Sequence, residues 1–305
     1  MPSSAASDTS IRTDRRAARE GQDSSTTFTA MASPCVVLVD TSDRALGAAV
    51  GDWVKSEALR IEIKYSRYRP SIVTHINEHA GDEVEVDEET ADLIDYAALC
   101  HGLSEGLFDI TSGVLRRVWK FDGHGRLPAP EQVEEALRFV GWHRVQWNRP
   151  RLRLEPGMEI DFGGIGKEYA VDQALAMLRC RTPAPVLVNF GGDLRVNGPR
   201  RDGAPWRVAI EDVDHLGDSA GLLELFNGAV ATSGNTHRYF EKNGIRYGHV
   251  LNPKSGWPIQ QAPKSITVHA DTCTEAGQLA KLALLRGAGA EEFLETEQVR
   301  AWCIR

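Results

Sequence analysis

The sequence predicts an α+β fold, in which helices flank mixed or antiparallel sheets. Amphipathic helical periodicity dominates the first part of the chain, short β-rich runs dominate from residue 144 onward, and Gly-rich turns end several of those runs. Helices and strands that are grouped in this way favour α+β over a doubly wound α/β fold. A chain of 305 residues with 42% hydrophobic content can bury a substantial core.

The N-terminal residues 1–27 are rich in Ser, Thr, Asp and Arg and contain no apolar stretch. This composition predicts a disordered tail and excludes the apolar core of a secretory signal. The folded domain is therefore predicted to span residues 28–305, beginning near Thr27 with a segment whose second half forms a strand ending at Asp40.

Helix signals follow in order. Ser42 or Asp43 is expected to cap a long helix with an apolar stripe. The segment 67–71, which contains Pro70, is expected to break this helix. A second helix is predicted after the N-cap Asp87, and a short one begins at Pro130. The Gly/Pro-rich stretch 122–130 is predicted to be a surface excursion, and any subdomain boundary is expected there.

The second half of the chain is predicted to be mostly β-structure, with two further helices. The helices are expected at 169–180 and 274–286. Strands are expected at 144–147, 151–155, 159–162, 185–190, 206–211, 221–225, 230–232, 246–251, 265–269 and 299–304.

Charge and cysteine content exclude several classes of protein. The net charge of −8 gives no electrostatic footprint for a nucleic-acid partner. No run approaches the roughly 20 apolar residues of a transmembrane helix, so membrane insertion is not expected. The five cysteines are scattered, without metal-ligand or disulfide spacing, as is typical of reduced thiols. The sequence therefore predicts a cytoplasmic protein.

Three Gly-centred blocks predict a pocket for a phosphate-bearing ligand, because glycines let backbone N–H groups approach an anion. The first runs from Asp161 through Gly163, Gly164, Gly166 and Lys167 to Asp172; the second is Gly191-Gly192-Asp193; the third joins Ser233-Gly-Asn to His249 and Gly256. A P-loop is excluded, because positions 161 and 168 hold Asp and Glu. Taken alone, the first block is equally compatible with an ordinary strand-to-helix turn, and for the second block a β-hairpin turn is the favoured interpretation.

One histidine lies in a sequence context that is compatible with a catalytic role. His249 lies between a predicted strand and a Pro-Lys-Ser-Gly turn, where an imidazole can act as a general base near neutral pH. A Ser–His–Asp hydrolase centred on Ser233 is discarded, because Ser233 precedes Gly234 without the first glycine of a Gly-x-Ser-x-Gly elbow.

Taken together, the ordered motifs resemble the ApbE family, the FAD:protein FMN transferases. The resemblance runs from about Phe28 to Gly287 and includes three further segments: Met31-Ala-Ser33, the stretch 66–71 followed by Asn77, and Gly106-Leu-Phe-Asp-Ile-Thr111. It implies an α+β fold of the T-fold type with FAD in a cleft between two lobes. It also implies transfer of FMN from FAD onto a Ser or Thr hydroxyl of a target flavoprotein, with release of AMP.

The resemblance assigns roles residue by residue. His249 matches the proposed base, Tyr68 an aromatic residue that stacks on flavin, and Asn77 a polar residue near the cofactor. The remaining ligand-pocket positions are Met31, Asp161, Gly163, Gly164, Lys167, Asp172, Gly191, Gly192, Asp193 and Ser233.

The magnesium site that the resemblance implies is altered here. The family uses an Asp, a Thr four residues later and a backbone carbonyl; this chain has Gly277, Lys281 and the carbonyl of Gly166. One carbonyl is too little for Mg²⁺. Three explanations stay open. Lys281 replaces the metal as a catalytic cation; the site has decayed and the protein is a non-catalytic flavin carrier or regulatory protein; or Glu168, Asp271 or Glu275 recruits metal differently.

Overall fold

The computed structural model describes residues 11–13, 23–121, 126–213, 215, 219–235, 239–242 and 245–305. The structural statements below concern these residues. Part of the expected surface excursion at 122–130 lies outside them.

A seven-stranded sheet in the order β15-β14-β11-β8-β7-β3-β2 forms the centre of the fold, and every neighbouring pair is antiparallel. A second sheet has the order β1-β9-β10. The strands of the two sheets are β1 (Ile11–Thr13), β2 (Asp23–Ala30), β3 (Ser33–Asp40), β7 (Val186–Phe190), β8 (Asp193–Val196), β9 (Trp206–Glu211), β10 (Ser219–Leu225), β11 (Gly228–Gly234), β14 (Ser265–Ala270) and β15 (Arg300–Ile304). The predicted α+β class is confirmed.

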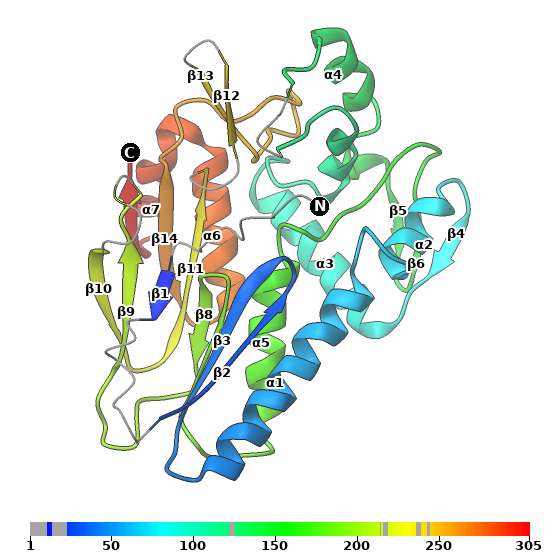
Figure 1. Ribbon diagram of the computed structural model, residues 1–305. Helices are drawn as coiled ribbons and strands as arrows, with labels where there is room; N and C mark the ends of the chain where they lie inside the picture. Colours follow the sequence, from blue (N-terminus) through cyan, green and yellow to red (C-terminus); the bar gives the residue numbers. More distant parts are fainter. Residues whose placement is uncertain are drawn as a thin grey trace, which may run out of the picture.

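Both faces of the central sheet are buried. Successive side chains of a strand point to opposite faces, so neighbouring residues of one strand belong to different cores. In β3, Cys35, Val37 and Val39 belong to the core beneath the helices. Leu38, between them, packs with Trp206 of the second sheet. The sheet is therefore the middle layer between helices on one side and β9 and β10 on the other (Figure 1).

Helices α1 (Arg44–Lys64), α5 (Gly166–Leu178) and α6 (Cys273–Leu285) cover one face of the central sheet. The predicted caps explain where two helices begin: the Asp43 carboxylate accepts hydrogen bonds from Ala45 N and Leu46 N, and Asp87 caps α3 (Glu88–Leu103) by accepting from Thr90 N.

Smaller elements surround this centre. They are α2 (Ile72–Glu78), α4 (Pro130–Leu137), α7 (Ala290–Thr296), the 3₁₀ helices Ile110–Arg117, Trp142–Arg144 and Gly287–Gly289, and the strands β4 (Glu83–Glu85), β5 (Gln146–Asn148), β6 (Arg151–Arg153), β12 (Tyr239–Lys242) and β13 (Ile245–Gly248). Trp119, Val133 and Phe240 share a satellite core that includes residues on both sides of 122–130. A subdomain boundary there remains a prediction.

Three expectations need correction. Residues 159–162 form no strand, because Asp161 N bonds to the Ile110 carbonyl and Ile160 N to the Asn77 side chain rather than to a sheet. β2 begins at Asp23, before the expected start at Thr27, and β1 lies within the expected tail, because β3 and β9 offer free edges for pairing. The helices α2 and α7 and the strand β12 were not predicted, since each is too short for a periodic signal.

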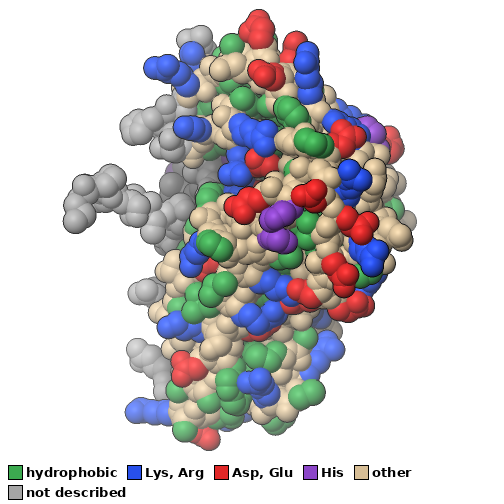
Figure 2. Space-filling model, turned by 90° about the vertical axis from the view of Figure 1, so that its right-hand side faces the viewer, with side chains coloured by type: hydrophobic (Ala, Val, Ile, Leu, Met, Phe, Trp, Pro, Cys, Tyr) green, Lys and Arg blue, Asp and Glu red, His purple; other side chains and the backbone are tan. Residues whose placement is uncertain are grey.

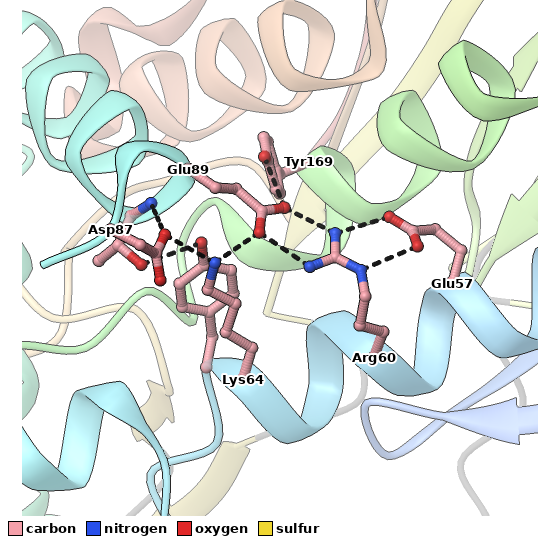
Figure 3. Close-up of polar contacts among 8 residues, drawn as sticks. Glu57, Arg60, Lys64, Asp87, Glu89 and Tyr169 are labelled. Carbon is pink, nitrogen blue, oxygen red and sulfur yellow. Dashed lines mark hydrogen bonds and ion pairs between the residues drawn. The ribbon is translucent and has the colours of Figure 1, made fainter.

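An ion network joins α1, α3 and α5, and we call it the helix-linking network (Figure 3). Arg60 bonds both Glu57 and Glu89, while Lys64 bonds Glu89 and Asp87, and Tyr169 of α5 donates to Glu89 at 3.0 Å. Arg60 lowers the pKa of the Glu89 carboxyl to about 2, against the opposing effect of partial burial.

The surface on the side of α2 and β4–β6 carries acidic and basic side chains intermixed, without a large area of one sign (Figure 2). No helix among the described residues is both long and apolar enough to cross a membrane.

Candidate functional site

The first Gly block forms the turn into α5. The Asp161 carboxylate accepts from Gly163 N at 2.9 Å and makes an ion pair with Arg67, in the segment between α1 and α2. α5 then begins at Gly166, so Lys167 and Glu168 stand in its first turn. A helix N-terminus preceded by glycines favours an anionic ligand through its unpaired N–H groups.

The second block is the two-residue turn of the β7–β8 hairpin, and the hairpin interpretation is confirmed. Gly191 and Gly192 have φ angles of 61° and 94°, which glycine adopts without steric cost. Asn189 Oδ1 accepts from Gly192 N at 2.8 Å, which fixes the turn. The turn presents Asp193 at the start of β8.

A buried ion pair connects the first two blocks and reaches the third. Lys167 Nζ lies 2.8 Å from Asp193 Oδ2 and 3.3 Å from the Gly191 carbonyl oxygen. Asp193 Oδ1 accepts from Thr232 N at 3.1 Å, directly before Ser233. Burial disfavours the charged ammonium, but the neighbouring Asp193 carboxylate prevails and raises the pKa of Lys167. The Asp193 carboxylate therefore favours the charged form of Lys167 where the blocks meet.

The two parts of the third block also lie together. A Cβ at Gly248 would lie 2.2 Å from Asn235 Cγ, so any other residue would require the Asn235 side chain to move. The loop of His249 therefore lies against the end of β11. The His249 ring also packs edge-on against Phe121, with 6.5 Å between ring centroids.

A second ion pair lies beside the first. Glu168 of α5 pairs with Lys281 of α6, and Lys281 Nζ also donates to the Gly277 carbonyl oxygen at 3.2 Å. Because Lys167 and Glu168 are consecutive residues in the first turn of α5, the two pairs are neighbours and form one cluster. We call Lys167, Glu168, Asp193 and Lys281 the buried ion quartet.

Met31 is also brought to this region. Met31 and Ala32 form the tight β2–β3 turn, with φ angles of 51° and 55°. The neighbouring Pro34 carbonyl accepts from Gly191 N at 2.9 Å. The β2–β3 turn therefore lies against the second Gly block, as the assignment of Met31 to the ligand pocket requires.

Two predicted ligand-binding side chains have protein partners that give them structural roles. Asn77 makes paired hydrogen bonds of 3.0 and 2.7 Å with the backbone of Ile160, so it positions the approach to Asp161. Asp172 accepts from Cys273 N, Thr274 N and the Thr274 hydroxyl, and it pairs with Arg195. It therefore ties α5 to the start of α6.

Tyr68 is an exposed member of the predicted site, with 77% of its surface accessible. The guanidinium carbon of Arg67 lies 5.0 Å from the centroid of its ring. An exposed aromatic ring beside the Asp161–Arg67 pair has a free face for a planar ligand.

Sequence reasoning missed Arg67, Asn189 and Thr232, which fix Asp161, the Gly191-Gly192 turn and Asp193. Asn189 could have been found from the sequence, because Asn commonly stabilises a following turn through its side chain. The other two depend on contacts between residues distant in the chain.

The magnesium position implied by the resemblance does not fit Mg²⁺. The carboxylates of Asp161, Glu168, Asp172 and Asp193 each have a cationic partner. Within the described residues, no group of three or more His, Cys, Asp or Glu side chains is arranged to hold a metal ion. Mg²⁺ favours uncommitted carboxylate oxygens in octahedral geometry, and the quartet offers ammonium groups instead.

Comparison with known proteins gives concordant matches. The profile of the ApbE family matches residues 27–303. An FAD:protein FMN transferase of Vibrio cholerae is 32% identical over 73% of this chain and 69% of its own length. One from Haemophilus influenzae is 32% identical over 67% of this chain, and the match spans 62% of that relative. A crystal structure of an ApbE protein from Thermotoga maritima superposes with a TM-score of 0.85 at 31% identity, over 92% of this chain and 94% of that one.

Proposed function

The chain belongs to the ApbE family, and from this premise we propose that it transfers FMN from FAD to a target flavoprotein. FAD is its substrate, and the acceptor is a Ser or Thr hydroxyl on a surface loop of the target. The scattered cysteines, all unpaired in the structure, support a reducing compartment and hence a cytoplasmic target.

The observation that carries the proposal is the Lys167–Asp193 ion pair, because it gathers the three Gly blocks around one cation. Lys167 Nζ and the first turn of α5 supply positive charge and backbone N–H groups on one side of a common centre, and the Gly191-Gly192 turn places no side chain there. Such a centre suits a pyrophosphate, whose charge requires several converging donors.

The reaction exchanges one P–O bond for another. The acceptor hydroxyl oxygen bonds to the FMN phosphorus, the pyrophosphate bond breaks, and the bridging oxygen leaves with AMP. We propose that His249 takes the hydroxyl proton, and that Lys167 and Lys281 stabilise the negative charge that develops on the phosphate oxygens. Tyr68 would stack on the flavin ring, with Met31 and Ser233 lining the same pocket.

Covalent flavin on an acceptor protein tests the proposal. The purified protein is incubated with FAD and an extract of cells that carry it, and proteins are separated under denaturing conditions. We expect flavin fluorescence on a discrete band, an acceptor mass increased by FMN less water, and AMP in the supernatant.

The matched control is His249→Asn, which removes the base while keeping a similar polar volume. We expect it to bind FAD and to form no labelled acceptor. Failure of the wild-type protein to bind FAD would refute the proposal. Binding without AMP or labelled acceptor would instead favour the flavin carrier, for which the substitution of both side-chain metal ligands is the supporting observation.

A further inference from the structure

We propose that Lys281, held by Glu168, is the fixed cation of the nucleotide site in place of a divalent metal, so that FAD binding neither needs nor responds to Mg²⁺. The inference rests on the proposed function, because it concerns the charge that faces the FAD pyrophosphate. It chooses among three explanations that the sequence leaves open.

Three residues at this position are sterically interlocked. A Cβ at Gly277 would lie 2.6 Å from Glu168 Cγ and 2.7 Å from Glu168 Oε1. An acidic side chain at position 277 is therefore incompatible with the observed place of Glu168. Glu168 in turn bonds Lys281, one helical turn beyond Gly277. Glu168 fills the space that Gly277 leaves and positions the ammonium group there.

The same arrangement opposes a metal ion. Lys281 and Lys167 place two ammonium groups in the cluster, and both carboxylates of the quartet already have ammonium partners. A divalent ion would have to displace an ammonium from Glu168 or Asp193 and remain close to it. In a poorly solvated site, repulsion between like charges makes that unfavourable. This argues against recruitment of metal through Glu168.

Lys281 keeps the capacity to contact a ligand. Its side chain is 18% exposed, whereas the Glu168 side chain is 6% exposed. The ammonium group has three N–H donors, of which two are directed to Glu168 and the Gly277 carbonyl. No other acceptor for it is found among the described residues, so the third can donate to a phosphate oxygen. Lys281 is thus a binding residue of the proposed reaction, and Glu168 is its positioning residue.

The test is calorimetric titration of the full chain with FAD, first in excess EDTA and then in millimolar MgCl₂. We expect the two dissociation constants to agree within about twofold. A Kd that Mg²⁺ lowers by about tenfold or more would overturn the inference while leaving the proposed function intact. Absence of FAD binding in both buffers would overturn the proposed function as well, so the two failures are distinguishable.

Variants test the role of Lys281 itself. Lys281→Met alone leaves Glu168 without its cation and can impair folding, so Lys281→Met/Glu168→Gln serves as the charge-balanced version. We expect this double variant to keep a cooperative thermal transition and to lose FAD affinity by about tenfold or more. Affinity within about twofold of wild type would overturn the inference.

The matched control is Lys64→Met. Lys64 has a similar side-chain exposure of 21% and also pairs with a glutamate, but it belongs to the helix-linking network. We expect Lys64→Met to leave the FAD affinity unchanged within about twofold, with and without Mg²⁺. A loss equal to that of the Lys281 variant would show that removing any half-buried lysine suffices, and would overturn the assignment.

Discussion

The helix-linking network and the buried ion quartet both consist of carboxylates paired with basic side chains, but the carboxylates are buried to different extents. In the network, the side chains of Arg60 and Glu89 are 44% and 23% exposed. In the quartet, the carboxylates of Asp193 and Glu168 are only 2% and 6% exposed, although their lysine partners reach solvent at 27% and 18%. Exposed ion pairs contribute little to stability, whereas a buried pair is costly to break. This difference distinguishes ion pairs that connect helices from ion pairs that form the proposed nucleotide site.

The neighbours of the two clusters also differ. Around the network lie side chains of α1, α3 and α5, with Tyr169 as a further donor (Figure 3). Around the quartet lie backbone groups, namely the Gly191 carbonyl, which accepts from Lys167, and the first turn of α5, whose N–H groups favour an anion. Charged groups are retained in a poorly solvated place at a cost in stability, and functional sites are where that cost is commonly found.

Asp193→Ala is expected to have the largest effect on stability. It leaves the Lys167 ammonium, on a side chain that is 27% exposed, and the Thr232 N–H without their acceptor, and the free energy of unfolding should fall by about 3 kcal/mol, the lower end of the range for a broken buried pair. Urea denaturation measures this value. A loss below about 1 kcal/mol, as expected for an exposed pair, would remove the distinction between the clusters.

Gly277→Ala should lower the free energy of unfolding by about 1–3 kcal/mol, because the added Cβ overlaps Glu168. In a Glu168→Ala background the same change should cost much less. A double-mutant cycle of the two substitutions measures the coupling. Strictly additive costs would show that Gly277 and Glu168 are not interlocked.

The helix-linking network predicts that the stability of the fold depends on pH in the acid range. The folded pKa of Glu89 is about 2, below its ordinary 4.5. Its stabilisation is therefore complete above pH 4.5 and is lost as the pH falls from 4.5 toward 2. After allowance for solvent screening we expect about 1–2 kcal/mol. Melting temperatures of wild type and Glu89→Gln should converge across this interval; a constant gap would contradict the assignment.

Asp87→Asn should have the smallest effect. Asparagine keeps the N-cap of α3 but loses the ion pair with Lys64, so the cost should stay below about 1 kcal/mol. Thermal melts at low and high salt measure it, and the difference from wild type should shrink as salt is raised. A difference independent of salt would indicate that the pair is not its source.

The sequence predicted the helices through their caps and periodicity, because Asp43, Asp87 and Pro130 act within one turn of themselves. It predicted the Gly191-Gly192 hairpin for the same local reason. It could not predict that Asn77 and Asp172 would be used by the backbone and by α6, since those partners are distant in the chain. The resemblance showed that Lys281 replaces a metal ligand of the family. Its ion pair with Glu168 could not be predicted, because it depends on the contact between α5 and α6.

The most direct measurement compares the FAD dissociation constants of two double variants, each of which removes both charges of one ion pair. Lys167→Met/Asp193→Asn deletes one pair of the quartet, and Lys64→Met/Glu89→Gln deletes one pair of the network. We expect the first to weaken FAD binding by about tenfold or more, and the second to leave it within about twofold of wild type. Equal affinity in both variants would contradict the account that the quartet builds the nucleotide site.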